Sequence, residues 1–279
     1  MDYIGTIYRP PSEANSLLLQ ITIGCSHNGC SFCVMYKDKK FKLKSLEIIE
    51  NDLKEISIYK NRIKKVFLMD GDALILKQNK LIKILKLINF YLPNIEKITT
   101  YANSRSILRK SIDELKELRK LKLKMVYHGA ESGDNKILKD INKNSTREEN
   151  IESAKRLKAA NIKHSVMILL GIGGEKFSNQ HAINTATMLT EMDPDFVGAL
   201  TLMLAPNTPL YEKIIKKEFI VTQKDTILKE LRTIIELSNF TNCRFSSNHA
   251  SNYLPLKIDL PRDKNMALDF VEKIIDSQN

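Results

Sequence analysis

Apolar and polar positions alternate along the chain with two different periods. Short runs rich in β-branched and other apolar residues predict strands at 17–23, 65–69, 95–101, 123–128, 164–170 and 196–204. Between these runs, apolar residues recur at helical spacing in 45–59, 77–90, 104–121, 146–160 and 178–191. Thr146 and Glu149 form a capping-box pattern at the start of one helix, and Asn161 provides a stop signal at its end.

Six strand-then-helix units in succession predict an α/β fold with a parallel sheet and helices outside it. Several strand runs are continuously apolar, which is typical of strands buried on both faces. Because such crossovers are right-handed, the sheet either opens into a doubly wound form or curls into a barrel. Six strands are too few for a complete eight-stranded barrel, so an open, partial barrel is one alternative.

The C-terminal region has a different pattern. A helix is predicted near 222–239 and another near 263–276. Between them the sequence CRFSSNHASNYLPLKIDLPRDK is polar and asparagine-rich and shows little periodicity. This segment predicts a loop that caps the open side of the sheet.

Unusual polar or glycine-rich groups follow every predicted strand. These groups are the cysteine cluster at 25–33, Asp70-Gly71-Asp72, 101–105, Gly129-Ala130-Glu131-Ser132-Gly133, 171–175 and 205–209. In parallel α/β folds the carboxyl ends of the strands meet at one edge, where chemistry collects. The convergence of these groups predicts an enzyme with its site on one face of the sheet.

Composition narrows the class of protein. No apolar run approaches the ~20 residues of a membrane helix, and the N-terminal residues lack the basic start and apolar block of a secretory signal. We therefore expect a cytoplasmic protein with no membrane partner. The net charge of +11 comes from lysines scattered over helical segments, so nucleic acid is a possible partner that charge alone does not favour.

Three of the four cysteines, Cys25, Cys30 and Cys33, lie within nine residues, which favours a metal site over disulfides in a cytosolic chain. A structural zinc site needs four protein ligands, and His27 is the nearby fourth candidate. Three thiolates on one loop instead suit an iron–sulfur cluster with one iron left open for a substrate or cofactor. Zinc remains the alternative metal.

The spacing Cys-x4-Cys-x2-Cys, with Phe32 before the last cysteine, resembles the cluster loop of the radical SAM superfamily, whose commonest form is one residue shorter. The branch that it resembles contains coproporphyrinogen oxidase-like and Elp3-like enzymes. The resemblance implies a parallel (βα)6 partial TIM-like barrel over residues 1–210, with helices and a polar loop at 211–279 capping it. It also implies that Cys25, Cys30 and Cys33 ligate a [4Fe-4S] cluster whose fourth iron binds S-adenosylmethionine (SAM).

The same resemblance assigns cofactor contacts. Phe32 would lie against the adenine. Asp70-Gly71-Asp72 stands where the family usually has Gly-Gly-Glu, so Gly71 and Asp72 would hold the methionine ammonium group. Glu131 belongs to a Glu-Ser-Gly motif whose acid helps to hold the cofactor in relatives. The fifth-strand motif MILLGIGGE would cradle adenine. The predicted cofactor-binding residues are therefore Phe32, Gly71, Asp72, Asn103, Glu131, Leu170, Gly171 and Gly173.

Structural roles compete with several of these assignments. Asp70 and Asp72 could cap a helix N-terminus, as could Asn103, and Glu131 could pair with a surface lysine. The glycines at 171–174 do not form a dinucleotide fingerprint, because Lys176 occupies the last small position. Catalytic residues are not assigned. Cys243 could donate a hydrogen atom, but a buried free cysteine is the commoner role.

Four polar residues could contact substrate. His128 ends the fourth predicted strand and could point into the barrel, although a satisfied structural histidine is the alternative. Asn248, His249 and Asn252 form a polar group in the tail that could contact substrate or form turns.

The predicted function is reductive cleavage of SAM to a 5′-deoxyadenosyl radical, which abstracts hydrogen from a small or medium metabolite. The resemblance implies an electron donor such as flavodoxin or ferredoxin. One alternative is a radical SAM enzyme that modifies RNA or another macromolecule. A different class is a non-catalytic, zinc-stabilised nucleic-acid-binding protein.

Overall fold

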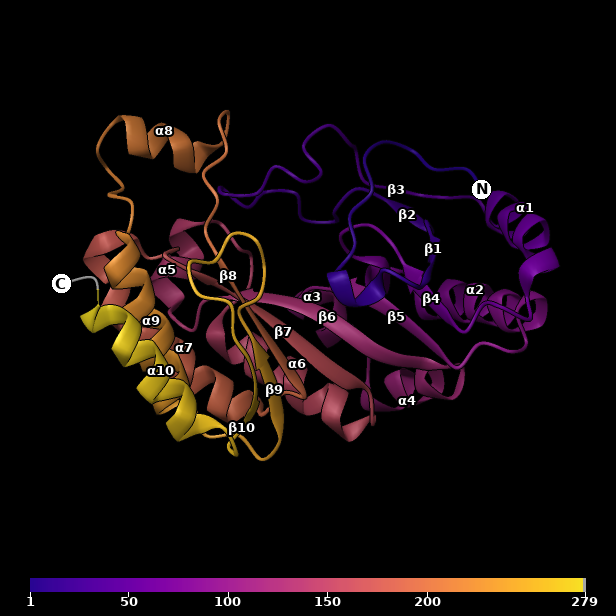
Figure 1. The fold of residues 1–279 in the computed structure, drawn as a ribbon. Helices are drawn as coiled ribbons and strands as arrows, with labels where there is room; N and C mark the ends of the chain where they lie inside the picture. The colour runs from indigo at the N-terminus through magenta and orange to yellow at the C-terminus, as the bar shows by residue number, and fades with distance from the viewer. Residues whose placement is uncertain (278–279) are drawn as a thin grey trace. The chain divides into compact units, whose positions relative to one another are not determined.

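The computed structural model describes residues 1–277, which form an α/β fold with a mostly parallel eight-stranded sheet (Figure 1). The chain divides into two compact units. Unit 1 comprises residues 1–28, 35–128 and 155–164. Unit 2 comprises residues 29–34 and 129–154 and the described residues from Ser165 onward.

Unit 1 contains the strands β1 (Leu17–Leu19), β4 (Lys65–Leu68), β5 (Lys97–Ala102) and most of β6 (Leu123–Glu131), in that order and parallel. Between β1 and β4, the chain also forms a short antiparallel pair, β2 (Thr22–Ile23) and β3 (Lys42–Leu43). Apolar residues of α1 (Leu46–Ile56), α2 (Gln78–Tyr91) and α4 (Ile112–Lys120) bury the outward-facing strand residues in one core. The unit also contains α3 (Ser104–Leu108) and short 3-10 turns at 11–13, 57–59 and 73–75.

Unit 2 contains most of β7 (Lys163–Leu170), then β8 (Phe196–Thr201), β9 (Cys243–Ser246) and β10 (Lys257–Leu260). β7, β8 and β9 are parallel, and β10 pairs antiparallel with β9. The helices α7 (Gly174–Met192), α9 (Lys224–Leu237) and α10 (Lys264–Asp276) lie side by side (Figure 1), and their apolar faces form one core with the strands. The remaining helices are α5 (Asn135–Asp140), α6 (Arg147–Ala159), which begins in this unit, and α8 (Pro209–Ile215).

Local signals explain several boundaries. The capping box at the start of α6 is present, because Thr146 Oγ1 accepts from the Glu149 N–H while the Glu149 carboxylate accepts from the Thr146 N–H. Asn161 adopts a left-handed conformation (φ 56°) just after this helix, which confirms it as the stop.

Three expectations about elements were wrong. The tail at 243–260 was expected to be a loop, but its ends form β9 and β10, which extend the sheet to eight strands. The helix expected over 104–121 is two helices, because Ser111 and Glu114 form a second capping box inside it. The strand expected over 17–23 is interrupted between β1 and β2.

Among residues 1–277, no helix combines the length and apolar character needed to span a membrane. The division into a core at 1–210 and a capping segment at 211–279 stays a prediction.

Candidate functional site

The cysteine loop carries three reduced, half-buried thiols. Cys25 belongs to unit 1, whereas Cys30 and Cys33 belong to unit 2 and to a turn in which the Cys33 N–H donates to the Cys30 carbonyl oxygen. The backbone of Ser31 anchors this turn within unit 2, since its N–H donates to the carbonyl of Ile141 and its carbonyl accepts from the N–H of Leu210. Among residues 1–277, no three His, Cys, Asp or Glu side chains gather in an arrangement that could hold a metal ion.

The chemistry of this donor set nevertheless fits a cubane cluster. Thiolates are the protein ligands of such clusters, and three of them leave one iron open. Half-burial leaves each thiol accessible to an incoming cluster. His27 lies two residues after Cys25 and is not a required ligand in this arrangement.

Gly71 lies directly against Cys25 in unit 1. A Cβ atom built on Gly71 would meet Cys25 Cβ at 2.7 Å and Sγ at 3.1 Å. The Gly71 N–H also donates to the Gly24 carbonyl at 3.0 Å, so two backbone segments run close together here. Only glycine fits, which explains this residue in the predicted Asp70-Gly71-Asp72 motif.

Asp70 holds the segment before Cys25 in place. Its Oδ2 accepts from the Gly24 N–H at 2.6 Å and from Gln20 at 3.1 Å, and Lys39 lies 3.5 Å away. Burial raises the pKa of this carboxyl above its ordinary value, although these partners oppose the shift. The φ of 67° at Asp70 lies in the left-handed region that glycine adopts most easily. The common glycine of the family would fit the same backbone.

Asp72 is fully buried and forms a polar cluster with Ser26 and Asn103. Its Oδ2 accepts from Ser26 Oγ at 2.5 Å and from Asn103 Nδ2 at 2.8 Å. Burial raises the pKa of Asp72 to about 6, while these donors stabilise the charged form. The side chain does not cap the turn that follows it. Asn103 does cap α3 through its side-chain oxygen, so the capping role is confirmed, while its contact with the cofactor stays a prediction.

In unit 2, Glu131 pairs with Lys143. The distance from Lys143 Nζ to Glu131 Oε1 is 2.7 Å, and both side chains are mostly buried, at 12% and 14% exposure. Glu131 therefore does pair with a lysine, as the alternative to a cofactor role expected. However, this lysine is mostly buried and is not a surface residue. Glu131 has φ 64°, and Gly129 leaves space for its carboxylate, since a Cβ there would lie 2.4 Å from Oε1.

The fifth-strand motif ends in a glycine turn held by a residue from α9. Leu170 ends β7 and is buried, Gly171 has φ 79°, and a Cβ on Gly173 would approach Ile137 at 3.1 Å. The Gly171 N–H donates to Glu230 Oε2 at 2.7 Å. Burial raises the pKa of Glu230 to about 7. Sequence reasoning did not identify Glu230, because it lies 59 residues from its partner.

Phe32 is partly buried against an apolar cluster within unit 2. This cluster contains Ile137, Leu138, Ile141, Leu169, Ile172 and Leu210. Phe32 and the Gly171–Gly173 turn therefore share the cluster that contains Ile172. Their assignment to an adenine-binding surface stays a prediction.

The four residues predicted to contact substrate lie in different settings. His128 is buried in unit 1, 2.9 Å from Ser104 Oγ and 3.1 Å from His164, which favours the structural role. Asn252 donates to the carbonyls of Ala199 and Ser247 and accepts from Thr201, so it fixes the tail onto β8. Asn248 accepts from Ser246 Oγ, and His249 bonds to Ser251.

Cys243 is completely buried on β9, and burial raises the pKa of its thiol to about 12. This agrees with the role of a buried free cysteine, which was expected to be the commoner one.

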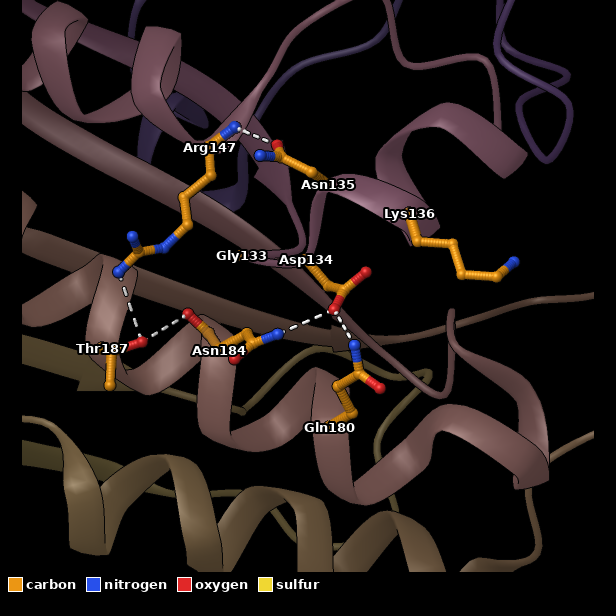
Figure 2. A pocket seen from close by; sticks show the side chains of 8 residues that line it. All are labelled: Gly133, Asp134, Asn135, Lys136, Arg147, Gln180, Asn184 and Thr187. Carbon is orange, nitrogen blue, oxygen red and sulfur yellow. Dashed lines mark hydrogen bonds between the residues drawn. The ribbon is translucent and has the colours of Figure 1, made fainter.

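A cavity of about 560 Å³ on unit 2, drawn in Figure 2, contains none of the predicted site residues. Its polar side chains bond to one another, since Asp134 accepts from Gln180 and Asn184.

Comparison with known proteins decides the family. The sequence profile of the Radical SAM superfamily matches residues 19–186, more than half of the chain. The chain belongs to the radical SAM superfamily. The expected superfamily, α/β fold class and cofactors are therefore confirmed: radical SAM proteins carry a [4Fe-4S] cluster and bind SAM.

A curated relative, "tRNA-2-methylthio-N(6)-dimethylallyladenosine synthase" from Bdellovibrio bacteriovorus, is 26% identical over 217 residues. The match covers 74% of this chain and 45% of the relative. Coproporphyrinogen III oxidase (HemN) from Escherichia coli is a solved structure with a TM-score of 0.60 at 15% identity, covering 79% of this chain and 52% of that one. Elp3 from Methanocaldococcus infernus gives 0.57 at 14% identity, covering 93% and 63%.

The chain thus spans less than two thirds of the length of each of these three proteins. At such identities the solved structures show the fold alone, a partial TIM-like barrel.

Proposed function

We propose that the chain binds its [4Fe-4S] cluster through Cys25, Cys30 and Cys33 and uses it to cleave SAM reductively. The bound cluster and SAM supply an electron and a 5′-deoxyadenosyl radical that abstracts hydrogen from a substrate. The proposal rests mainly on the contact of Gly71 with Cys25, because this contact brings the cysteine loop next to the predicted cofactor motif Asp70-Gly71-Asp72.

The protein residues bind and orient the cofactor. Asp72, kept in place by Ser26 and Asn103, would accept a hydrogen bond from the SAM ammonium group. Glu131, kept in place by Lys143, would hold a further polar group of the cofactor. Phe32, Leu170, Gly171 and Gly173 would form the adenine surface, and the buried apolar residues around them exclude water.

An electron donor and a substrate complete this proposal. A one-electron donor such as flavodoxin or ferredoxin would reduce the cluster, and a cytoplasmic location agrees with that need. The sequence-based prediction for the substrate is a small or medium metabolite, with His128, Asn248, His249 and Asn252 as possible contacts.

RNA is the second candidate substrate, and two observations favour it. Positive charge is concentrated in unit 1, which has 28 lysines and arginines against 13 aspartates and glutamates. The curated relative is named for the modification of a tRNA base.

One experiment tests the central proposal. The protein is purified without oxygen, its cluster is reconstituted, and SAM is added with a strong reductant. We expect iron, sulfide and 5′-deoxyadenosine, and we expect Cys30→Ala to lose all three. A zinc-loaded protein, or iron binding that never yields 5′-deoxyadenosine with or without cell extract, would contradict the proposal.

A further inference from the structure

Charge is divided very unevenly between the two units. Unit 1 has 28 lysines and arginines against 13 aspartates and glutamates, whereas unit 2 has 16 against 20. A genome-wide bias toward lysine codons would raise the lysine content of both units equally. The excess therefore requires an explanation that is local to unit 1.

Part of this excess lies beside the strand ends that carry the predicted cofactor residues. Six exposed cations come from three segments: Lys40 and Lys42 before α1, Lys77 and Lys80 at the start of α2, and Arg105 and Arg109 at α3. We call these six residues the basic rim. Within residues 1–277, none of the six forms an ion pair, and the acid closest to them in sequence is Asp38.

Structural contacts bring the three segments of the basic rim together. Lys110, which follows α3, donates to the carbonyl of Leu76 at 2.9 Å, just before Lys77. A cavity of about 240 Å³ joins the segment after Lys42 to the start of α2, since Leu43 and Leu46 line one side and Leu76 and Lys80 the other. These contacts place the three segments that carry the basic rim next to one another in unit 1.

The lysines of α2 do not serve the stability of the helix. Lys77 precedes its first residue and Lys80 lies in its first turn, where the helix dipole disfavours positive charge. α2 contains no acidic residue, so Lys80, Lys83 and Lys86 have no partner at helical spacing. These cations cost stability unless an external anion neutralises them.

We propose that the basic rim binds RNA, so that a nucleoside of an RNA is the substrate of the radical reaction. The radical reaction on the RNA nucleoside rests on the proposed function, whereas RNA binding by the basic rim does not depend on it. Lysines and arginines would neutralise successive phosphates. The apolar cavity between them would accept an unstacked base, because RNA-modifying and RNA-reading proteins act on bases that are splayed from loops.

The arrangement fits RNA better than other anions. A small anion would need a buried polar pocket, whereas all six rim side chains are exposed on separate segments. A membrane-surface helix would present its apolar face to lipid, but Leu81, Ile84, Leu85 and Ile88 of α2 are buried in the unit 1 core. α2 therefore has lysines available and no apolar face for a bilayer.

The test measures binding of a short fluorescent RNA stem–loop to the cluster-loaded protein at several salt concentrations. The variant Lys40→Ala/Lys42→Ala/Lys77→Ala/Lys80→Ala removes four rim charges. The matched control removes four exposed lysines of unit 2, as Lys216→Ala/Lys224→Ala/Lys229→Ala/Lys257→Ala. We expect roughly tenfold or more loss of affinity in the rim variant, with a salt slope shallower by about three, and little change in the control.

A second pair of variants tests the cavity. Leu43→Glu places a carboxylate at the cavity wall and should weaken RNA binding severalfold, whereas Leu237→Glu, at a similarly exposed leucine of unit 2, should not. Equal loss in both lysine variants, or equal binding of a DNA stem–loop of the same sequence, would overturn the proposal. Tighter binding to vesicles that contain an anionic phospholipid would overturn it as well.

The two proposals fail separately. Formation of 5′-deoxyadenosine by the unmodified protein without RNA tests the radical chemistry alone. Absence of RNA binding in a protein that cleaves SAM removes the RNA inference and leaves the proposed function intact.

Discussion

The side-chain amide of Asn103 donates to Oδ2 of Asp72 at 2.8 Å, and the oxygen of the same amide caps α3 by accepting from Ser106 at 2.9 Å. Asn103 therefore connects the start of α3 with the carboxylate of Asp72, which we propose as a contact of SAM. The capping and the carboxylate contact use different atoms of the amide, so substitutions can separate them.

Asn103→Ala should remove both interactions, whereas Asn103→Ser should keep the cap and lose the contact with Asp72. A cap contributes about 1 kcal/mol, and a hydrogen bond to a charged group about 1.5–3 kcal/mol. We expect Asn103→Ala to lower the free energy of unfolding by about 3 kcal/mol and Asn103→Ser by about 2 kcal/mol, measured by urea denaturation. An unchanged Asn103→Ser protein would show that the contact with Asp72 contributes little.

Gly71→Ala should prevent stable cluster binding, because its Cβ would lie 2.7 Å from Cys25 Cβ and displace that ligand. We expect the iron content per chain and the visible absorbance to fall severalfold while the circular dichroism spectrum is retained. Gly198→Ala is the matched control, since a Cβ there meets no atom closer than 3.9 Å. Full iron loading of Gly71→Ala would show that Cys25 can bind a cluster from another position.

The six strands β1, β4, β5, β6, β7 and β8 were predictable because each is a short run rich in apolar residues. The antiparallel pair in the tail was missed for a physical reason. β9 and β10 are four residues each, and their alternation of buried and exposed positions is too short to distinguish from a polar loop. Their pairing with β8 and with each other, which joins residues distant in sequence, decides their structure.

The break inside 104–121 could have been predicted. Ser111 and Glu114 have the spacing of a capping box, and this signal marks a helix start in the middle of a continuous helical pattern. Glu230 could not have been found in the same way, because nothing near it in the sequence indicates that it bonds to Gly171. Motif spacing identifies residues that share a loop, whereas supporting contacts depend on the folded chain.

Lys143→Met should weaken SAM binding. Lys143 holds the Glu131 carboxylate at 2.7 Å, and without this partner the carboxylate is free to adopt other rotamers. We expect about tenfold lower affinity, equivalent to about 1.4 kcal/mol, in anaerobic equilibrium dialysis, with an unchanged iron content. Lys136→Met is the control, because Lys136 pairs with Asp140 at an exposed position. Equal affinities in the two variants would place Glu131 outside the SAM site.

Glu230 should make stability depend on pH near neutrality. Burial raises its pKa from an ordinary 4.5 to about 7 in the folded state, so the folded protein holds the proton more tightly than the unfolded chain. Its stabilising contribution is complete below about pH 4.5 and is lost as the pH rises through about 7. The difference amounts to about 3 kcal/mol for a shift of this size.

Glu230→Gln keeps an acceptor for the Gly171 N–H and removes the titration. We therefore expect the wild-type protein to lose stability relative to Glu230→Gln between pH 5 and 8, by roughly 3 kcal/mol at most, in chemical denaturation at a series of pH values. Glu236→Gln on the same helix, where the carboxylate is exposed and pairs with Arg232, is the control. Parallel stability curves for wild-type and Glu230→Gln would mean that Glu230 is already charged throughout this range, with its charge stabilised by the Gly171 N–H.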